Sequence, residues 1–180
     1  MREIRRALPI IILGMLICMT FSGTFAAQQS TPEKPRLIVV ASEEAYKLSQ
    51  GVINFIKGRG VPVLHVTTSE FNEYKTNKEK PDYRKEKYIL ILGGANESNG
   101  TGDLIKEVLT QEEVEWVSKT GNKKMYLKTD KWCKSQYILV FAGYDIKATY
   151  KALVDNKDDW WAYMRGWFDI EPTDEELYGY

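Results

Sequence analysis

Histidine and cysteine are scarce in this chain, and their scarcity excludes several kinds of site. The 180 residues include one histidine, His65, and two cysteines, Cys18 and Cys133. A zinc site usually needs about four such ligands at short spacings, and these residues cannot supply them. His65 lies in the apolar run Val61–Val66 and is expected to pack as a strand residue. No serine stands in a Gly-x-Ser-x-Gly elbow. We therefore assign no catalytic residue and no metal ligand.

A phosphate-binding loop is also lacking, although glycines cluster in Gly93–Gly102. A Walker A loop has the pattern Gly-x4-Gly-Lys-Ser/Thr, in which the lysine neutralises the phosphates. From Gly94 the next suitable glycine is Gly100, one residue too far, and Thr101 stands in place of the lysine. The dinucleotide fingerprint Gly-x-Gly-x-x-Gly lacks its third glycine. We expect a solvent-accessible turn from strand to helix, with no nucleotide affinity and no cofactor.

The chain has no excess of charge of either sign. Lysine and arginine total 25, and aspartate and glutamate also total 25. Nucleic-acid binding needs a concentrated basic face. The basic stretch 75–87 also holds three acidic residues, a mixture typical of a solvated loop. We therefore expect no nucleic-acid partner.

The N-terminus has the pattern of an export signal. Three arginines in the first six residues precede an uncharged, mostly apolar run, so residues 1–26 are interpreted as a signal peptide. The alternative is a retained anchor, because residues 8–27 are long enough to cross a ~30 Å hydrocarbon core. Membrane contact is expected only through residues 8–27, if the signal stays uncleaved. Either way, the remainder is expected outside the cytoplasm, secreted or associated with the cell surface.

Short apolar runs alternate with helical patterns between residues 37 and 158. The runs begin at Leu37, Val61, Tyr88 and Tyr137, and a stretch with helical features follows each. Unbroken apolar strands are typical of a parallel sheet covered on both faces. A shorter strand at 124–128 is a candidate for the sheet edge. The pattern predicts a three-layer Rossmann-like or flavodoxin-like α/β domain, a mostly parallel sheet with helices on both faces.

Two segments of different composition flank this predicted domain of residues 37–158. Residues 27–36 form a polar, proline-containing tether. The C-terminal extension, residues 159–180, is aromatic over Trp160–Phe168 and acidic beyond. We predict that the aromatic part packs over an open side of the sheet. The alternative is an exposed aromatic platform for a glycan or a partner protein.

A binding crevice is expected at one edge of the sheet, because ligands of open parallel sheets bind beyond the carboxyl ends of the strands. Acid–base chemistry there would depend on Glu44 and Asp145, but each stands at a helix start and is expected to stabilise it. The loop after the third strand also contains two consecutive glycosylation sequons, with Asn96 and Asn99 as acceptors. The candidate crevice residues are Ser42, Thr67, Gly93, Gly94, Asn96 and Asp145.

Glycines and strand residues recur in a distinctive order in the second half of the chain. The order is Gly93-Gly94, Asn99-Gly100-Thr101-Gly102, Lys124-Met125-Tyr126, Trp132, and Gln136–Gly143 before Asp145. It resembles a module of archaeal cell-surface proteins, including S-layer-associated ones, over roughly Leu37–Val154. The resemblance implies an α/β core and a place at the cell surface, and it supplies no catalytic residues.

These observations together favour a non-catalytic extracytoplasmic module of the cell envelope. Its role is expected to be structural or partner-binding, with an envelope protein or a glycan as partner. The alternative is a secreted hydrolase or carbohydrate-binding protein that uses the strand-end crevice or the aromatic tail. No pattern indicates an oligomeric state.

Overall fold

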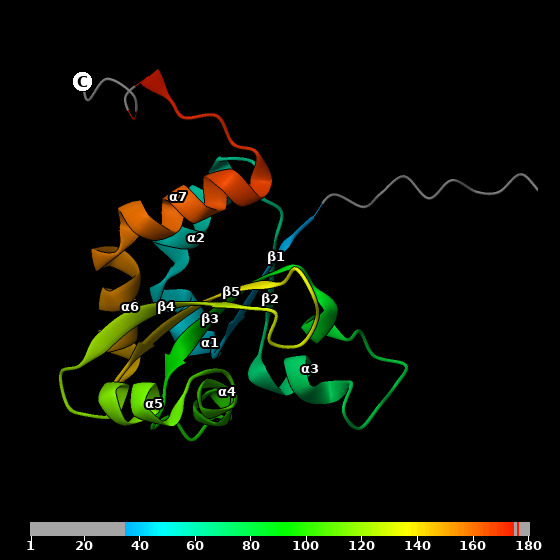
Figure 1. The fold of residues 1–180 in the computed structure, drawn as a ribbon, viewed down its shortest axis with the longest axis vertical. Coiled ribbons are helices and arrows are strands. Elements are labelled where there is room, and N and C mark those ends of the chain that lie inside the picture. The colour runs from blue at the N-terminus through cyan, green and yellow to red at the C-terminus, as the bar shows by residue number, and fades with distance from the viewer. Residues whose placement is uncertain (1–34, 175, 177–180) are drawn as a thin grey trace, which may run out of the picture. The chain divides into compact units, whose positions relative to one another are not determined.

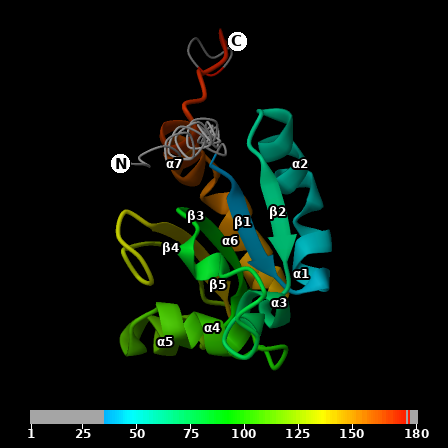
Figure 2. The same cartoon turned by 90° about the vertical axis from the view of Figure 1, so that its right-hand side faces the viewer.

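The computed structural model describes residues 35–174 and 176. The predicted signal peptide, residues 1–26, and most of the tether lie outside the described residues. The described chain forms a five-stranded sheet of β1 (Leu37–Ala41), β2 (Val63–Val66), β3 (Tyr88–Gly94), β4 (Lys123–Thr129) and β5 (Tyr137–Gly143), in the order β2-β1-β3-β5-β4 (Figures 1 and 2).

The sheet is parallel apart from one edge strand. β1 pairs in parallel with β2 and with β3, β3 pairs in parallel with β5, and β4 pairs with β5 in antiparallel register. Every residue of β1 and of β3 is buried. By contrast, only Tyr126 of β4 is buried, and β4 ends the strand order with one side unpaired. The predicted edge strand is therefore confirmed.

Helices cover both faces of the sheet (Figure 1). On one face, Leu37, Val39 and Leu90 contribute to a core with the apolar sides of α1 (Glu43–Leu48), α2 (Gln50–Gly58), α6 (Ile146–Asp155) and α7 (Lys157–Phe168). On the other face, Ile38 and Ile89 contribute to a core with α3 (Thr68–Glu73), α4 (Thr101–Val108) and α5 (Gln111–Val117). A short 3-10 helix, η1 (Tyr83–Lys85), precedes β3. The predicted three-layer, mostly parallel α/β fold is confirmed.

The aromatic segment is part of the first of these cores. Trp160 and Met164 are fully buried, and Trp161 is nearly so. The buried indole of Trp160 is satisfied, because its Nε1 donates a hydrogen bond of 2.8 Å to the carbonyl oxygen of Leu153. The prediction that this segment packs over the sheet is therefore confirmed for Trp160 and Trp161. Within the residues described, no helix is long and apolar enough to cross a membrane.

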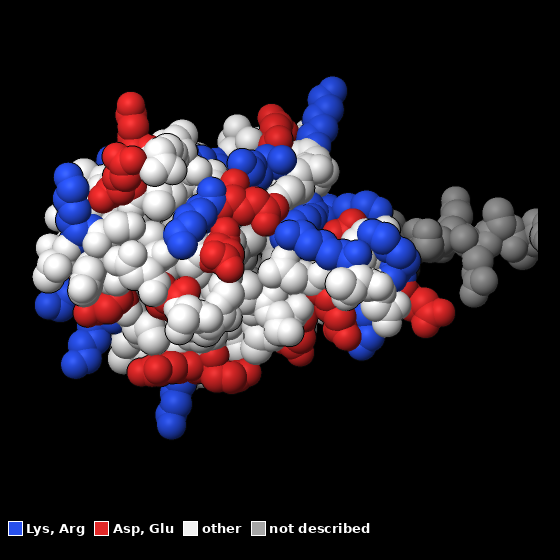
Figure 3. All heavy atoms as spheres, turned by 90° about the horizontal axis from the view of Figure 1, so that it is seen from below, with Lys and Arg blue, Asp and Glu red and all other residues white. Residues whose placement is uncertain are grey.

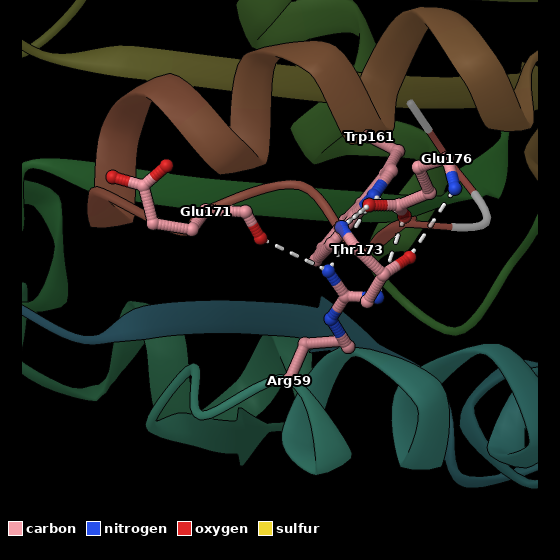
Figure 4. A network of polar contacts seen from close by, with 5 residues as sticks. All are labelled: Arg59, Trp161, Glu171, Thr173 and Glu176. Carbon is pink, nitrogen blue, oxygen red and sulfur yellow. Dashed lines mark hydrogen bonds and ion pairs between the residues drawn. The ribbon is translucent and has the colours of Figure 1, made fainter. Parts of the chain in front are cut away.

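The residues after α7 return to the domain and are held by one polar network (Figure 4). Arg59 Nη2, at the end of α2, lies 3.1 Å from Glu176 Oε2 and donates to the carbonyl oxygen of Glu171 at 3.3 Å. Trp161 Nε1 donates to Glu176 Oε1 at 2.7 Å, and the backbone N–H of Thr173 donates to Glu176 Oε2 at 3.0 Å. We call residues 170–174 and 176 the C-terminal strap.

Candidate functional site

The strand order locates the expected binding edge. From β1 the chain crosses to β2, and from β2 it returns past β1 to β3. The strand order therefore reverses between β1 and β3, and in open parallel sheets the crevice beyond the carboxyl ends at such a point is where ligands bind. The loops that matter are those after β1, β3 and β5.

An open pocket of about 400 Å³ lies at this edge. It brings together two predicted residues, Asn96 and Asp145, with Glu44. The other four predicted crevice residues, Ser42, Thr67, Gly93 and Gly94, are not among its lining residues in the described structure. The complete lining is Glu44, Asn96, Glu97, Tyr144, Asp145, Ile146 and Lys147.

Three of the predicted residues cap helices. Ser42 Oγ accepts a hydrogen bond from the first turn of α1 at 3.2 Å, and Asp145 Oδ1 accepts one from the first turn of α6 at 2.7 Å. Thr67 and Glu70 form a reciprocal capping box on α3, with Thr67 N donating to Glu70 Oε2 at 2.7 Å. These oxygens satisfy backbone N–H groups that lack a partner within their helix. The helix-start role expected of Asp145 is confirmed.

The two glycines that end β3 are required by packing. A Cβ on Gly93 would lie 2.0 Å from Cγ2 of Thr101, and a Cβ on Gly94 would lie 2.7 Å from the carbonyl oxygen of Gly143. Both glycines are buried. They permit β3 to approach α4 and the end of β5, and they do not present backbone to a ligand.

Glu97 is the residue that sequence reasoning missed. Its Oε1 accepts the N–H of Gly94 at 2.6 Å, and its Oε2 accepts from Nδ2 of Asn99 at 3.0 Å. Asn99 in turn accepts the N–H of Thr101 through Oδ1 at 3.0 Å. The glycine-rich loop is therefore closed by its own side chains, and a carboxylate stands against the Gly94 amide. The only signal in the sequence is a glutamate three residues after a strand-ending glycine.

The electrostatics of this edge are acidic. Burial raises the pKa of Glu97, hydrogen bonds from Asn99 and Gly94 oppose the rise, and the charges of Glu44 and Asp145 add to it. The pocket is lined by three carboxyl groups and by one ammonium group, that of Lys147, so the acids outnumber the cation that a phosphate would meet. In the part of the chain that the structure describes, no three His, Cys, Asp or Glu residues are grouped to hold a metal ion.

The two sequons differ in how they are presented. Asn96 and Ser98 are exposed, and Asn96 Nδ2 donates to the carbonyl oxygen of Ser118 at 3.1 Å. Thr101, the hydroxyl residue of the second sequon, is fully buried, and its Oγ1 lies 2.9 Å from Oγ1 of Thr68. After folding, only the sequon of Asn96 lies at the surface with both its acceptor and its hydroxyl residue.

A nucleophilic mechanism would depend on His65 and Cys133, and the surroundings of both residues disfavour such a role. The His65 ring stacks on Tyr46 with centroids 3.8 Å apart, and its Nε2 lies 3.2 Å from the carbonyl oxygen of Ala41. The packing expected of His65 is confirmed. Burial raises the pKa of the Cys133 thiol, with Asp130 and Asp82 adding to the rise. A raised pKa lowers the population of the reactive thiolate.

Charges of both signs are interspersed on the side of α4 and α5, with uncharged surface between them (Figure 3).

No protein-family profile matches the chain, and no curated protein or solved structure matches it. The resemblance to archaeal cell-surface modules thus stays a prediction.

Proposed function

We propose that this protein is a non-catalytic module of the cell envelope that acts outside the cytoplasm by binding another envelope component, in the manner of S-layer-associated domains. The observation that carries the proposal is the closed strand-end loop. Glu97 accepts the Gly94 N–H, and a carboxylate bonded to an amide of the glycine-rich loop keeps that amide from binding a phosphate.

The other polar side chains at this edge support the same conclusion. Ser42 and Asp145 are engaged at helix starts, and Asn96 is bonded to the end of α5. An active site instead arranges acids, bases and donors toward a substrate position. The pattern of residues 1–26 supports export, and the resemblance to archaeal surface modules supports a place in the envelope.

The location is tested by fractionating cells of the source organism and measuring the intact mass of the recovered protein. We expect the chain in the envelope or external fraction, shortened by about 26 residues at its N-terminus. A matched variant with the N-terminal arginines Arg2, Arg5 and Arg6 replaced by glutamate should stay inside the cell. Full-length wild-type protein in the soluble cytoplasm would contradict the proposal.

A second candidate is a secreted hydrolase or carbohydrate-binding protein that uses the same pocket. It is favoured by one observation: the pKa of Glu97 is raised by burial, and Glu44 and Asp145 line the pocket beside it. Carboxyl groups with divergent pKa values can divide the roles of acid and base. Isolated envelope glycans are the substrate to try. Turnover that disappears in Glu97→Gln, at an unchanged melting temperature, would favour this candidate over the first.

A further inference from the structure

An open groove runs between two helix pairs on the face of the sheet that carries α7. One wall is α1 and α2, and the other is α6 and the start of α7. It comprises two hollows of about 460 and 310 Å³, and on each wall the residues that line the second follow those that line the first along the chain. The first is lined by Leu48 and Ile146, and the second by Val52, Phe55 and Val154, among others.

The groove is apolar and open to solvent. Leu48 is 42% exposed and Val154 is 43% exposed, and they are two of only six large apolar side chains in the described residues with such exposure. Fully buried Trp160 closes the groove from beneath, and the Phe55 ring contacts Trp161 at a centroid distance of 4.9 Å. Exposed apolar side chains gathered in one groove and bordered by charges make it a candidate interaction site.

The spacing of the wall residues suits a helical partner. Leu48, Val52 and Phe55 recur at helical intervals on one wall, and Ile146, Tyr150 and Val154 do so on the other. A helix laid between two such walls presents side chains at i, i+3, i+4 and i+7 to them. The wall from Glu44 to Phe55 matches a partner helix of about three turns, roughly 17 Å.

The charges that line the groove are mostly positive. Lys47 on α1, Lys147 on α6 and Lys157 on α7 line it, and the one acidic residue in the lining is Glu44. Among the described residues, neither Lys47 nor Lys147 forms an ion pair within 4.0 Å. The Lys157 ammonium lies 4.8 Å from the centroid of the Phe55 ring.

Several acids lie near the groove. Asp145 lines the adjoining strand-end pocket, which shares Glu44 and Lys147 with the groove. Asp155, at the end of α6, is ion-paired with Lys123 of β4. Asp158 and Asp159 follow Lys157 on α7, but they are not among the residues that line either hollow. The lining of the two hollows therefore carries three lysines and one glutamate, a net positive charge beside apolar side chains.

We propose that this groove docks an acidic amphipathic helix of a partner protein. Its apolar side chains contact Leu48, Val52 and Val154, and its flanking Asp or Glu side chains pair with the lysines on the two walls. The inference rests on the partner-binding role proposed above, but not on the location of the protein. A helix fits better than a glycan, because carbohydrate recognition needs convergent hydrogen-bonding groups, and the floor is apolar.

The test uses the full chain and two synthetic helical peptides of about 14 residues. Both peptides carry the same apolar stripe at i, i+3, i+4 and i+7, but one has flanking glutamates and its twin has flanking lysines. We expect the acidic peptide to bind at least about tenfold more tightly than its twin, measured by fluorescence anisotropy. Its affinity should fall as salt rises from about 0.05 to 0.5 M, because salt screens the lysines.

Variants of exposed groove residues locate the binding without threatening the fold. Leu48→Glu and Val154→Glu should each weaken binding of the acidic peptide by about tenfold. The double variant Lys47→Glu and Lys147→Glu should remove the preference for the acidic peptide over its lysine-bearing twin. Leu127→Glu is the matched control, because Leu127 is an exposed apolar residue of β4 outside the groove, and it should leave binding unchanged.

Several results would overturn the inference. Equal binding of the two peptides, no binding of either, or equal losses in Leu48→Glu and Leu127→Glu would each do so. Binding to phosphatidylglycerol vesicles without binding to the acidic peptide would assign the groove to a membrane surface. A dimer in sedimentation that Leu48→Glu dissociates would assign it to a second copy. None of these results changes the fractionation test of location, so the two proposals fail separately.

Discussion

Glu97 in the strand-end loop and Glu176 in the C-terminal strap make the same local hydrogen bond in opposite surroundings. Each carboxylate accepts the N–H of the residue three positions earlier, Gly94 for Glu97 and Thr173 for Glu176. Burial and two neighbouring acids raise the pKa of Glu97. The hydrogen bond from the Thr173 N–H is the main cause that lowers the pKa of Glu176 to about 2. Hydrogen bonds from Trp161 and Arg59 lower it further.

The difference lies in what surrounds each turn. The strap glutamate receives three kinds of donor, namely a backbone N–H, an indole and a guanidinium (Figure 4). Glu97 closes a loop in which no cation is among the causes that shift its pKa, and Glu44 and Asp145 oppose its charge. The hydrogen bond of the turn thus favours the charged carboxylate in both places, but at Glu97 burial and the neighbouring acids outweigh it.

The largest expected effect comes from removing the buried Trp160 side chain of α7, next to Trp161, which holds the strap. Trp160→Ala should destabilise the domain by about 3–5 kcal/mol, because deleting a fully buried tryptophan leaves a cavity under α7. Thermal unfolding followed by circular dichroism measures it. Tyr163→Ala on the same helix is the control, since Tyr163 is 39% exposed, and it should cost much less. Equal losses would show that α7 is not held by its buried face.

The second effect is at the strand-end loop. Gly93→Ala should cost about 1–3 kcal/mol, because the new Cβ would lie 2.0 Å from Cγ2 of buried Thr101, whose hydroxyl is held by Thr68. Gly166→Ala on α7 is the opposite case: nothing lies within 4 Å of its Cβ position, and alanine favours the helix by about 0.5–1 kcal/mol. Urea denaturation of both variants checks the opposite signs.

Acid titration should separate the two glutamates directly. The folded pKa of Glu176 lies below 4.5, so its stabilisation is present above that value and is lost as the pH falls toward about 2. The folded pKa of Glu97 lies above 4.5, so its contribution is present below that value and is lost as the pH rises through the folded pKa. Relative to wild type, Glu176→Gln should flatten the loss of stability below pH 4.5. Glu97→Gln should instead remove the gain in stability that Glu97 gives as the pH falls toward 4.5 from above.

The free energy of unfolding, measured in urea from about pH 2.5 to pH 7, tests both signs. Glu70, Glu107 and Glu113 also have lowered pKa values, so the wild type should lose stability on acidification even without Glu176. Shifts of the same sign in the two variants would contradict the contrast between strap and loop.

The strand-end loop and the region of α7 also show what the sequence could and could not predict. The layers were predictable, because a strand buried on both faces is apolar at nearly every position, as Tyr88–Gly94 is. The packing of Trp160 was predictable from helical spacing, because Trp160, Met164 and Trp167 fall on one face of a helix. The role of Glu97 was not, because it depends on the chain turning back to the Gly94 amide. A glutamate among Asn, Ser and Gly has the pattern of a solvated residue.

Which residues lie near the binding edge was easier to predict than which of their side chains are free to contact a ligand. Asn96 and Asp145 do line the pocket, as the strand-end rule predicts. Ser42 and Thr67 do not, because each side chain turns to the helix that follows it. The groove between α1–α2 and α6–α7 could not be predicted, since it depends on how closely helices from distant parts of the chain approach.

The smallest expected effect sharpens the account of the strand-end loop by comparing its two asparagines. Asn99 joins Glu97 to the start of α4, so Asn99→Ala should cost about 1 kcal/mol. Asn96 makes one exposed bond to the Ser118 carbonyl, so Asn96→Ala should cost less than about 0.5 kcal/mol.

The difference between the two asparagines also governs glycosylation. A glycan added to the folded protein should occupy Asn96, whose sequon is exposed, and not Asn99, whose Thr101 is buried. Peptide mass mapping of protein recovered from its source decides this, and a glycan on Asn99 of natively folded protein would mean that the loop opens far more readily than its hydrogen bonds indicate.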